Sequence, residues 1–242
     1  MKKSVHILLL ICFPLWLNAQ ATSGNTGLLN IPSAEMQADG SFVFGANYLP
    51  ENMTPSTFSY NTGNYYLNLT FLPFLEVTYR CTLFKMEQTG RYTNQDRSFT
   101  LRARLLKEKK YQPAIVIGGN DILSSTPGEN DILGAEGRAE SRFYRAIYAV
   151  VSKNLRWSDH NIGLTLGSGF GDYNGGHLSG PFGGISISPS FLKQLSVIAE
   201  YDSHAINLGV SALLFKHLYL HAFSYDLKYF VGGFAYKIHL KK

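Results

Sequence analysis

The sequence predicts an all-β fold, an antiparallel up-and-down transmembrane β-barrel of about twelve strands. Three observations lead to this prediction. Segments of alternating apolar and polar residues recur along the chain, few residues are charged, and long polar connections alternate with short ones. Charged residues make up 16 % of the chain, whereas soluble domains carry roughly 25 %. Composition alone would also suit a soluble β-sandwich, so the prediction depends mainly on the alternation and on the connections.

The clearest alternation runs from Leu75 to Phe84. Side chains of a strand point to opposite faces in turn, so this stretch has one apolar and one polar wall. The apolar wall consists of Leu75, Val77, Tyr79, Cys81 and Leu83, and the polar wall of Glu76, Thr78, Arg80 and Thr82. The same pattern predicts strands near residues 41–49, 63–71, 75–84, 96–106, 113–122, 142–153, 161–167, 181–188, 195–202, 206–212, 218–225 and 229–240.

The connections between these segments provide a second test of the barrel. They are long and polar after the first, third, fifth and seventh predicted strands, and short after most of the others. Extracellular loops and periplasmic turns of a membrane barrel differ in this way, whereas Greek-key sandwiches have no reason to. The sequence therefore predicts a cell outer membrane location, with lipid as a partner of the outer wall.

The N-terminal region has the pattern of an exported protein. Lys2 and Lys3 precede an apolar run from Ile7 to Leu17, which predicts a cleavable signal peptide at residues 1–19. A transmembrane anchor is the alternative, but spanning needs about 20 apolar residues and Pro14 interrupts this run. Residues 20–39 are expected to be a periplasmic lead-in segment, and residues 40–242 the outer-membrane barrel. With Cys12 in the signal peptide, Cys81 has no partner for an internal disulfide.

Charged residues on the predicted polar faces form the candidate functional site. Arg80, Arg102 and Arg104 project to one side of two adjacent predicted strands. A Lys or Arg on the lipid face costs roughly 2–4 kcal/mol near the midplane, so these residues are expected to face the lumen. They either attract an anionic glycan or pair with glutamates across a filled interior. The residues expected in this lumen charge stripe are Glu76, Arg80, Arg102, Arg104, Arg145, Glu200 and Lys237.

Other motifs give little support for catalysis or cofactor binding. Gly167 to Gly171 lacks the lysine and helix of a phosphate-binding loop, and the histidines lack metal-ligand spacing. We therefore predict no catalytic residue, cofactor, metal or nucleic-acid partner. A small barrel enzyme acting on lipid or glycan stays open as an alternative, with Ser211 and His221 on adjacent predicted strands as its candidates.

Three stretches together resemble the YjbH family of outer-membrane proteins. They are residues 27–40 (GLLNIPSA, then ADG), residues 98–121 (SFTLRARLLKEKKYQPAIVIGGND), and residues 149–171 (AVVSKNL, then IGLTLGSGFG), with IAEYD and INLGV following. The chain departs from the family after Asp121, where Ile122 to Ser125 replace the usual Gly-Thr-Gly.

The resemblance implies an association with exopolysaccharide and capsule production. It implies a non-enzymatic barrel that assists polysaccharide export or surface assembly. The partners implied are an anionic polysaccharide and other exopolysaccharide-export proteins. A structural barrel subunit of a secretion complex is a further alternative.

Overall fold

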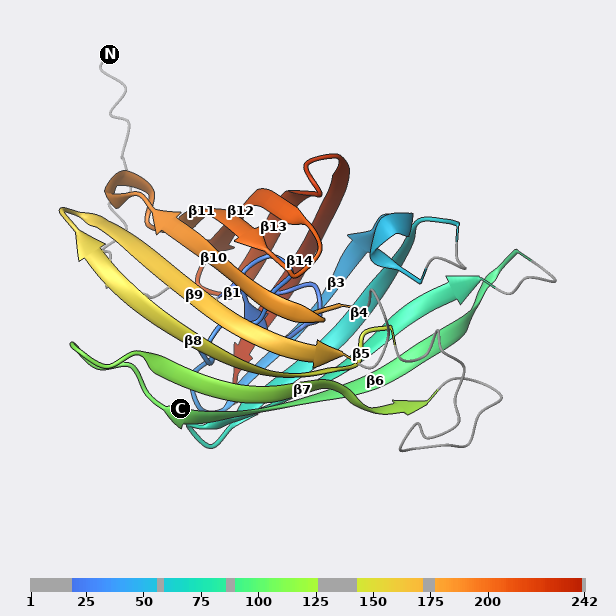
Figure 1. Ribbon diagram of the computed structural model, residues 1–242, viewed down its shortest axis with the longest axis horizontal. Helices are drawn as coiled ribbons and strands as arrows, with labels where there is room; N and C mark the ends of the chain where they lie inside the picture. Colours follow the sequence, from blue (N-terminus) through green and yellow to red (C-terminus); the bar gives the residue numbers. More distant parts are fainter. Residues whose placement is uncertain (1–18, 56–58, 86–89, 126–142, 172–176, 241–242) are drawn as a thin grey trace, which may run out of the picture.

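The computed structural model describes residues 19–55, 59–85, 90–125, 143–171 and 177–240, and its regular structure is almost entirely β. Twelve antiparallel strands, β3 to β14, form one closed barrel (Figure 1). The predicted fold class and strand number are thereby confirmed. The predicted signal peptide lies outside the described residues, apart from Ala19.

The barrel strands follow one another around the wall in chain order. They are β3 (Ser41–Leu49), β4 (Thr62–Phe71), β5 (Leu75–Lys85), β6 (Tyr92–Leu106), β7 (Ala114–Ser125), β8 (Ala146–Trp157), β9 (His160–Gly171), β10 (Gly180–Ser188), β11 (Leu195–Tyr201), β12 (Ile206–Leu214), β13 (Leu218–Tyr225) and β14 (Tyr229–His239). The last strand closes on the first, with Phe234 opposite Ala46 and Ile238 opposite Phe42. Closure leaves no unpaired sheet edge, as a bilayer requires. Among the described residues, no helix is both long and apolar enough to cross a membrane.

The wall is inverted relative to a soluble protein, because its polar residues are buried and its apolar residues are exposed. On β5, Glu76, Thr78 and Arg80 are buried, whereas on the neighbouring β6 Phe99 and Leu101 are each 42 % exposed. The apolar wall therefore forms the outside of the barrel, and the polar wall faces the lumen. This is the arrangement of a barrel that has lipid around it.

The two ends of the barrel differ. One end, called here the short-turn end, carries the connections 72–74, 107–113, 158–159, 189–194 and 215–217, the fourth of which contains the 3-10 helix η3 (Ser190–Leu192). The opposite end, called the long-loop end, carries the connection 50–61 with the 3-10 helix η1 (Glu51–Met53). The strands β6 to β9 are longer than β11 to β13, so the wall is higher on one side (Figure 1).

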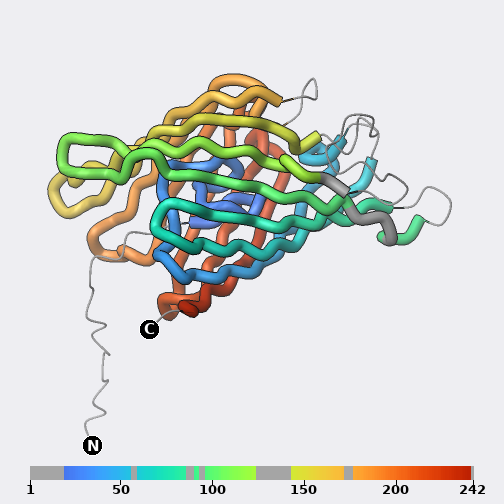
Figure 2. The backbone as a smooth tube through the Cα atoms, turned by 90° about the horizontal axis from the view of Figure 1, so that it is seen from below, coloured from blue at the N-terminus to red at the C-terminus, as the bar shows by residue number. Residues whose placement is uncertain are grey.

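Residues 19–39, called the plug below, fold inside the barrel. The short strands β1 (Ala19–Gln20) and β2 (Thr26–Gly27) pair there, and nearly every residue of the segment is buried. In Figure 2 this part of the chain runs behind and between the strands of the wall. The sequence predicts a lead-in segment in the periplasm, and the structure differs because the polar groups of this segment hydrogen-bond to the lumen wall.

Candidate functional site

The plug is a compact turn structure that enters and leaves the lumen at the short-turn end. Thr22 lies toward the long-loop end: its carbonyl accepts hydrogen bonds from Asn47 and Asn64 near the long-loop ends of β3 and β4, both at 2.9 Å. Its last residues return to the short-turn end, where Gly40 N donates to Thr70 O at 2.9 Å. Ala19 borders the same cavity as Glu35. The plug therefore fills the lumen without threading through it.

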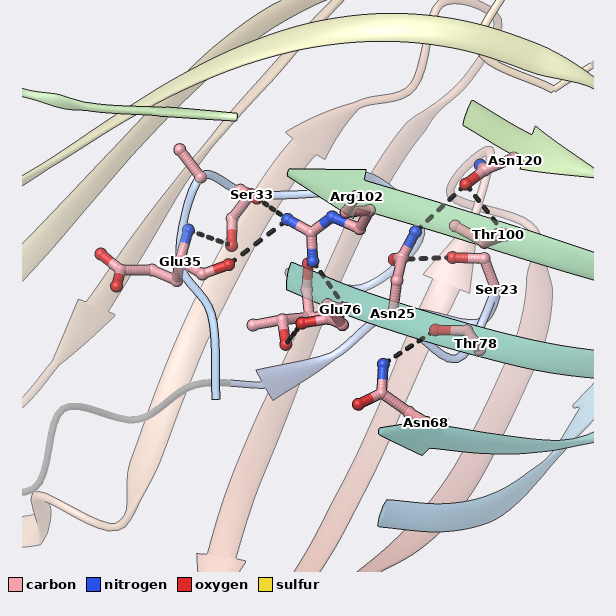
Figure 3. Close-up of polar contacts among 12 residues, drawn as sticks. Ser23, Asn25, Ser33, Glu35, Asn68, Glu76, Thr78, Thr100, Arg102 and Asn120 are labelled. Carbon is pink, nitrogen blue, oxygen red and sulfur yellow. Dashed lines mark hydrogen bonds and ion pairs between the residues drawn. The ribbon is translucent and has the colours of Figure 1, made fainter. Parts of the chain in front are cut away.

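A glycine lets the plug reach the wall. Gly24 adopts a left-handed φ of +83°, and a Cβ placed there would lie 2.4 Å from the ring of Tyr66. Any other residue would therefore meet both an unfavourable backbone conformation and a clash. Neighbouring Asn25 donates to Asn120 Oδ1 at 3.2 Å and to the Tyr148 hydroxyl at 3.4 Å, as Figure 3 shows for Asn120.

The first anchor of the plug is a buried carboxylate on β5. Glu76 accepts hydrogen bonds from Thr26 N at 2.8 Å and from Thr26 Oγ1 at 2.7 Å. It also forms an ion pair with Arg102 of β6, with 2.8 Å between Oε1 and Nη1 and no exposure of either side chain (Figure 3). Glu76 and Arg102 face each other across paired strands, so the sheet register places this pair.

The Arg102 guanidinium also forms hydrogen bonds with the plug. Its Nη1 donates to Thr26 O at 2.8 Å, and its Nη2 donates to the carbonyls of Ser33 and Glu35. A guanidinium carries several fixed donors and stays charged in proteins, so it suits a cluster of carbonyls in one position. Arg102 therefore joins two separate parts of the plug to the wall (Figure 3).

The second anchor lies on the other side of the lumen. Glu200 of β11 accepts from Leu29 N at 3.0 Å and from Asn30 N at 2.7 Å. Asn30 also donates to Asp202 Oδ2 at 2.6 Å, and Asn207 donates to both carboxylates at 3.1 Å. Two acids on opposite sides of the wall thus hold backbone amides of one short segment, which fixes its orientation.

The remaining residues of the predicted stripe do not join this pair. Arg80 is buried four residues along β5 from Glu76, or roughly 13 Å at strand spacing, and its guanidinium lies 4.0 Å from the ring centre of Tyr144. Arg104 is partly exposed and donates to the carbonyl of Pro73 in a short turn. Arg80 and Arg104 therefore lie apart from the Glu76–Arg102 pair.

Arg145 and Lys237 are the last two residues of the predicted stripe. Arg145 lies directly before β8, two residues from the exposed Ile147. Residues two apart share a face of a strand, so Arg145 is on the outer face and not among the lumen-facing side chains. Lys237 lies in the lumen near the short-turn end, where its Nζ donates to the Tyr219 hydroxyl at 3.1 Å. Tyr219 in turn donates to Gln37 Oε1 of the plug at 3.3 Å.

A small cavity lies between the plug and the wall formed by β8 to β12. Its volume is about 40 Å³, which is room for roughly three water molecules. Hydroxyl groups of the wall surround it, together with Glu35 and Asn154. Asn154 donates to Glu35 Oε1 at 2.5 Å and to Glu108 Oε2 at 2.7 Å. Burial raises the pKa of the Glu35 carboxyl, although the hydrogen bond from Asn154 opposes this shift.

The enzyme candidates Ser211 and His221 are opposite each other on β12 and β13, as the sequence predicts for adjacent strands. Both are buried, yet neither Ser211 Oγ nor His221 Nε2 has a hydrogen-bond partner. The hydroxyl–imidazole contact that would activate a serine is therefore not formed. Among the described residues, no group of three or more His, Cys, Asp or Glu side chains is arranged to hold a metal ion.

The plug residues are the part of this site that sequence reasoning missed. Thr26, Leu29 and Asn30 bind the wall mainly through backbone amides, and backbone groups leave no trace in composition. Two features of the sequence could have indicated these contacts. Glu76 and Glu200 lie on predicted lumen faces, and a segment rich in Gly, Asn and Thr precedes the first barrel strand. Buried carboxylates need donors, and this segment supplies them.

Residues 19–207 match the family model of YjbH, described as exopolysaccharide biosynthesis protein YbjH. The chain belongs to the YjbH family. The family predicted from sequence is thus confirmed, and the matched region includes the plug as well as the strands from β3 to β11. No curated protein matches the chain. Among solved structures, a "KdgM porin" is similar over 82 % of this chain and 99 % of that chain, with 12 % identity and a TM-score of 0.47, which is too weak to bear on function.

Proposed function

We propose that this YjbH-family chain is a non-enzymatic outer-membrane barrel that assists the export or surface assembly of an exopolysaccharide. The observation that carries the proposal is membership of a family described by exopolysaccharide biosynthesis, in a chain that folds as a closed barrel with an apolar outer wall. Its expected partners are an anionic polysaccharide, other exopolysaccharide-export proteins and outer-membrane lipid.

The filled lumen limits how such a barrel could work. Arg102, the central cation of the predicted stripe, is fully buried and engaged by Glu76 and by plug carbonyls. It cannot contact a polysaccharide while the plug is docked. Passage of a glycan through the lumen therefore requires the plug to leave, whereas assistance from the rims of the barrel does not.

The first test of the proposal is genetic and biochemical. Deletion of the gene should lower secreted or surface polysaccharide, and the wild-type chain should restore it. Fractionation should place the protein in the outer membrane, where it should migrate faster on a denaturing gel unboiled than boiled. Normal polysaccharide output after deletion, or recovery of a soluble periplasmic monomer, would contradict the proposal.

A disulfide can then distinguish the two routes. Ala34 N donates to Ser152 Oγ at 2.8 Å, so paired cysteines at Ala34 and Ser152 should link plug to wall. The matched control pairs Ser152 with Thr165, whose hydroxyls lie 2.9 Å apart and which links only wall to wall. Both pairs are made in a background without Cys12 and Cys81.

The proposed passage route predicts loss of polysaccharide output when the Ala34–Ser152 pair is oxidised. Output should return on reduction, and the Ser152–Thr165 pair should have no effect. Full output from cells in which the plug is completely cross-linked would exclude passage through the lumen and leave assistance at the rims.

A further inference from the structure

Four consecutive turns at the short-turn end share one composition. Each has one strongly exposed aromatic side chain, either within the turn, as for Tyr111 at 87 %, Phe191 at 85 % and Phe215 at 84 %, or directly before it, as for Trp157 at 73 %. These turns connect β6 to β7, β8 to β9, β10 to β11 and β12 to β13, so they occupy one continuous arc of the barrel end. Large aromatic groups in such numbers are not left in water without a reason.

Each of these aromatic residues has an exposed cation one or two positions away in the chain. The cations are Lys110, Arg156, Lys193 and Lys216. The Lys110 Nζ lies 5.1 Å from the ring centre of Tyr111, and the side chains of Arg156, Lys193 and Lys216 make no ion pair within the described part of the chain. We call these four aromatic and four basic residues the basic–aromatic collar.

Within the described residues, the other turn at the short-turn end lacks this combination. The turn between β4 and β5 exposes Leu72 and Phe74 but has no charged residue. At the long-loop end, Lys228 is paired with Asp226 at 2.8 Å, and Lys85 lies 4.8 Å from the ring centre of Tyr60. Cations at those places are already engaged, whereas three of the collar have no acidic partner among the described residues.

We infer that the basic–aromatic collar binds the anionic phospholipid headgroups of the leaflet at the short-turn end. Aromatic rings favour the boundary between hydrocarbon and water, and lysine and arginine beside them reach the phosphate layer. The only acids in these turns are Glu108, which is paired with Lys153, and the exposed Asp159, so the arc has an excess of positive charge. An anionic headgroup complements that charge and a neutral one does not.

Repetition over four turns distinguishes this arc from scattered surface residues. The arc runs from β6 to β13, and the residues of the turn between β4 and β5 include no cation. The lipid contact would therefore hold that arc of the barrel at the headgroup level. The inference depends on the strands spanning a membrane and is independent of the proposed role in polysaccharide export.

The chain contains a natural reporter for this contact. Its two tryptophans are Trp16 and Trp157, so Trp16→Phe leaves the collar residue as the sole tryptophan. The refolded protein is placed in nanodiscs of phosphatidylcholine that contain an equal share of either brominated phosphatidylglycerol or brominated phosphatidylcholine. Bromine near the headgroup quenches tryptophan fluorescence on contact, so the ratio of quenching measures the preference for anionic lipid.

We expect stronger quenching by the brominated phosphatidylglycerol, with an enrichment of about fivefold for a headgroup held by one cation. High salt should reduce that preference. The triple variant Arg156→Gln, Lys193→Gln, Lys216→Gln should abolish the preference while Trp157 stays quenched by both lipids. Lys228→Gln at the long-loop end is the matched control and should change nothing.

Two results would overturn the inference. Equal quenching by the two brominated lipids in the unmodified collar would mean that the contact does not select anionic headgroups. Absence of quenching by either lipid would mean that the collar faces water, as a surface for an acidic protein or an anionic glycan would. Faster migration of unboiled samples on a gel shows in each case that the variant barrel is folded.

Discussion

Replacement of Glu76 by glutamine should release the plug without unfolding the wall. In the docked state Glu76 neutralises Arg102 and accepts two hydrogen bonds from Thr26, and neither charged side chain is exposed. Glu76→Gln leaves the guanidinium buried without a counter-charge, and arginine cannot lose its proton to relieve this. Breaking a buried ion pair from one side costs about 3–5 kcal/mol.

That cost falls on the docked state alone. Once the plug leaves, water enters the lumen and hydrates Arg102, so the undocked barrel has no buried unpaired charge and is not destabilised. A loss of about 3–5 kcal/mol in docking free energy corresponds to a rise of roughly 10²- to 4 × 10³-fold in the undocked population. The ladder of strands from β3 to β14 is not touched by the substitution.

Thiol labelling of the plug measures this population. Ala34 is fully buried, so Ala34→Cys in a background without Cys12 and Cys81 should react only when the plug undocks. Glu76→Gln should raise its labelling rate by about 10²-fold or more. Adding Arg102→Ser removes the unpaired charge and should partly restore protection.

The exposed ion pair between Asp226 and Lys228 provides the control. Asp226→Asn breaks an ion pair whose side chains are 67 % and 44 % exposed, so it should leave plug labelling unchanged. If Glu76→Gln forms a folded barrel and Ala34→Cys reacts no faster than before, the ion pair does not hold the plug.

Three further predictions follow from the same geometry. Gly24→Ala should undock the plug and expose Ala34→Cys to labelling, because the new Cβ would lie 2.4 Å from Tyr66. The control is Gly90→Ala, which has a similarly positive φ but no atom within 4 Å of the new Cβ, and it should leave Ala34→Cys protected. On intact cells an impermeant reagent should label cysteines at Asn61 and Gly90 but not at Lys109 and Lys216, and the reverse pattern would mean that the short-turn end faces outward. The raised pKa of Glu35 in the docked plug means that docking is strongest below the ordinary carboxyl pKa and weakens as pH rises through the raised pKa. The labelling rate of Ala34→Cys relative to Gly90→Cys should therefore rise with pH, and Glu35→Gln should remove that rise.

The barrel was predictable from sequence because its constraint is local. Lipid outside and polar groups inside impose an alternation that each strand shows by itself, as Leu75 to Phe84 does. Strand ends were less predictable, since they depend on neighbours. β9 continues to Gly171, although the glycines suggest a loop from Gly169 onward; a Cβ at Gly169 would lie 2.2 Å from Leu178 O, so glycine is required within that strand.

The plug was not predictable in the same way, because its contacts are long-range. Thr26 and Glu76 are 50 residues apart, and Asn30 and Glu200 are 170 apart. No periodicity within residues 19–39 shows which wall residues they will meet. The predicted stripe contained Glu76, Arg102 and Glu200 for the correct electrostatic reason, namely that charges avoid lipid, but their partners became visible only after the strands were closed into a barrel.

The way the plug is held indicates that it is the part of the molecule most readily displaced. The wall is joined by continuous ladders of backbone hydrogen bonds whose loss within a membrane costs several kcal/mol per group, because lipid offers no replacement partner. The plug is joined by side-chain and amide hydrogen bonds that water in an emptied lumen would replace, so each contributes only about 0.5–3 kcal/mol net, with bonds to charged groups in the upper part of that range. The cavity bordered by Glu35 and Asn154 leaves one side of the plug without packed wall side chains. Both its ends lie at the short-turn end, so it can leave in that direction without crossing the wall, and any partner able to trigger its release would act from there.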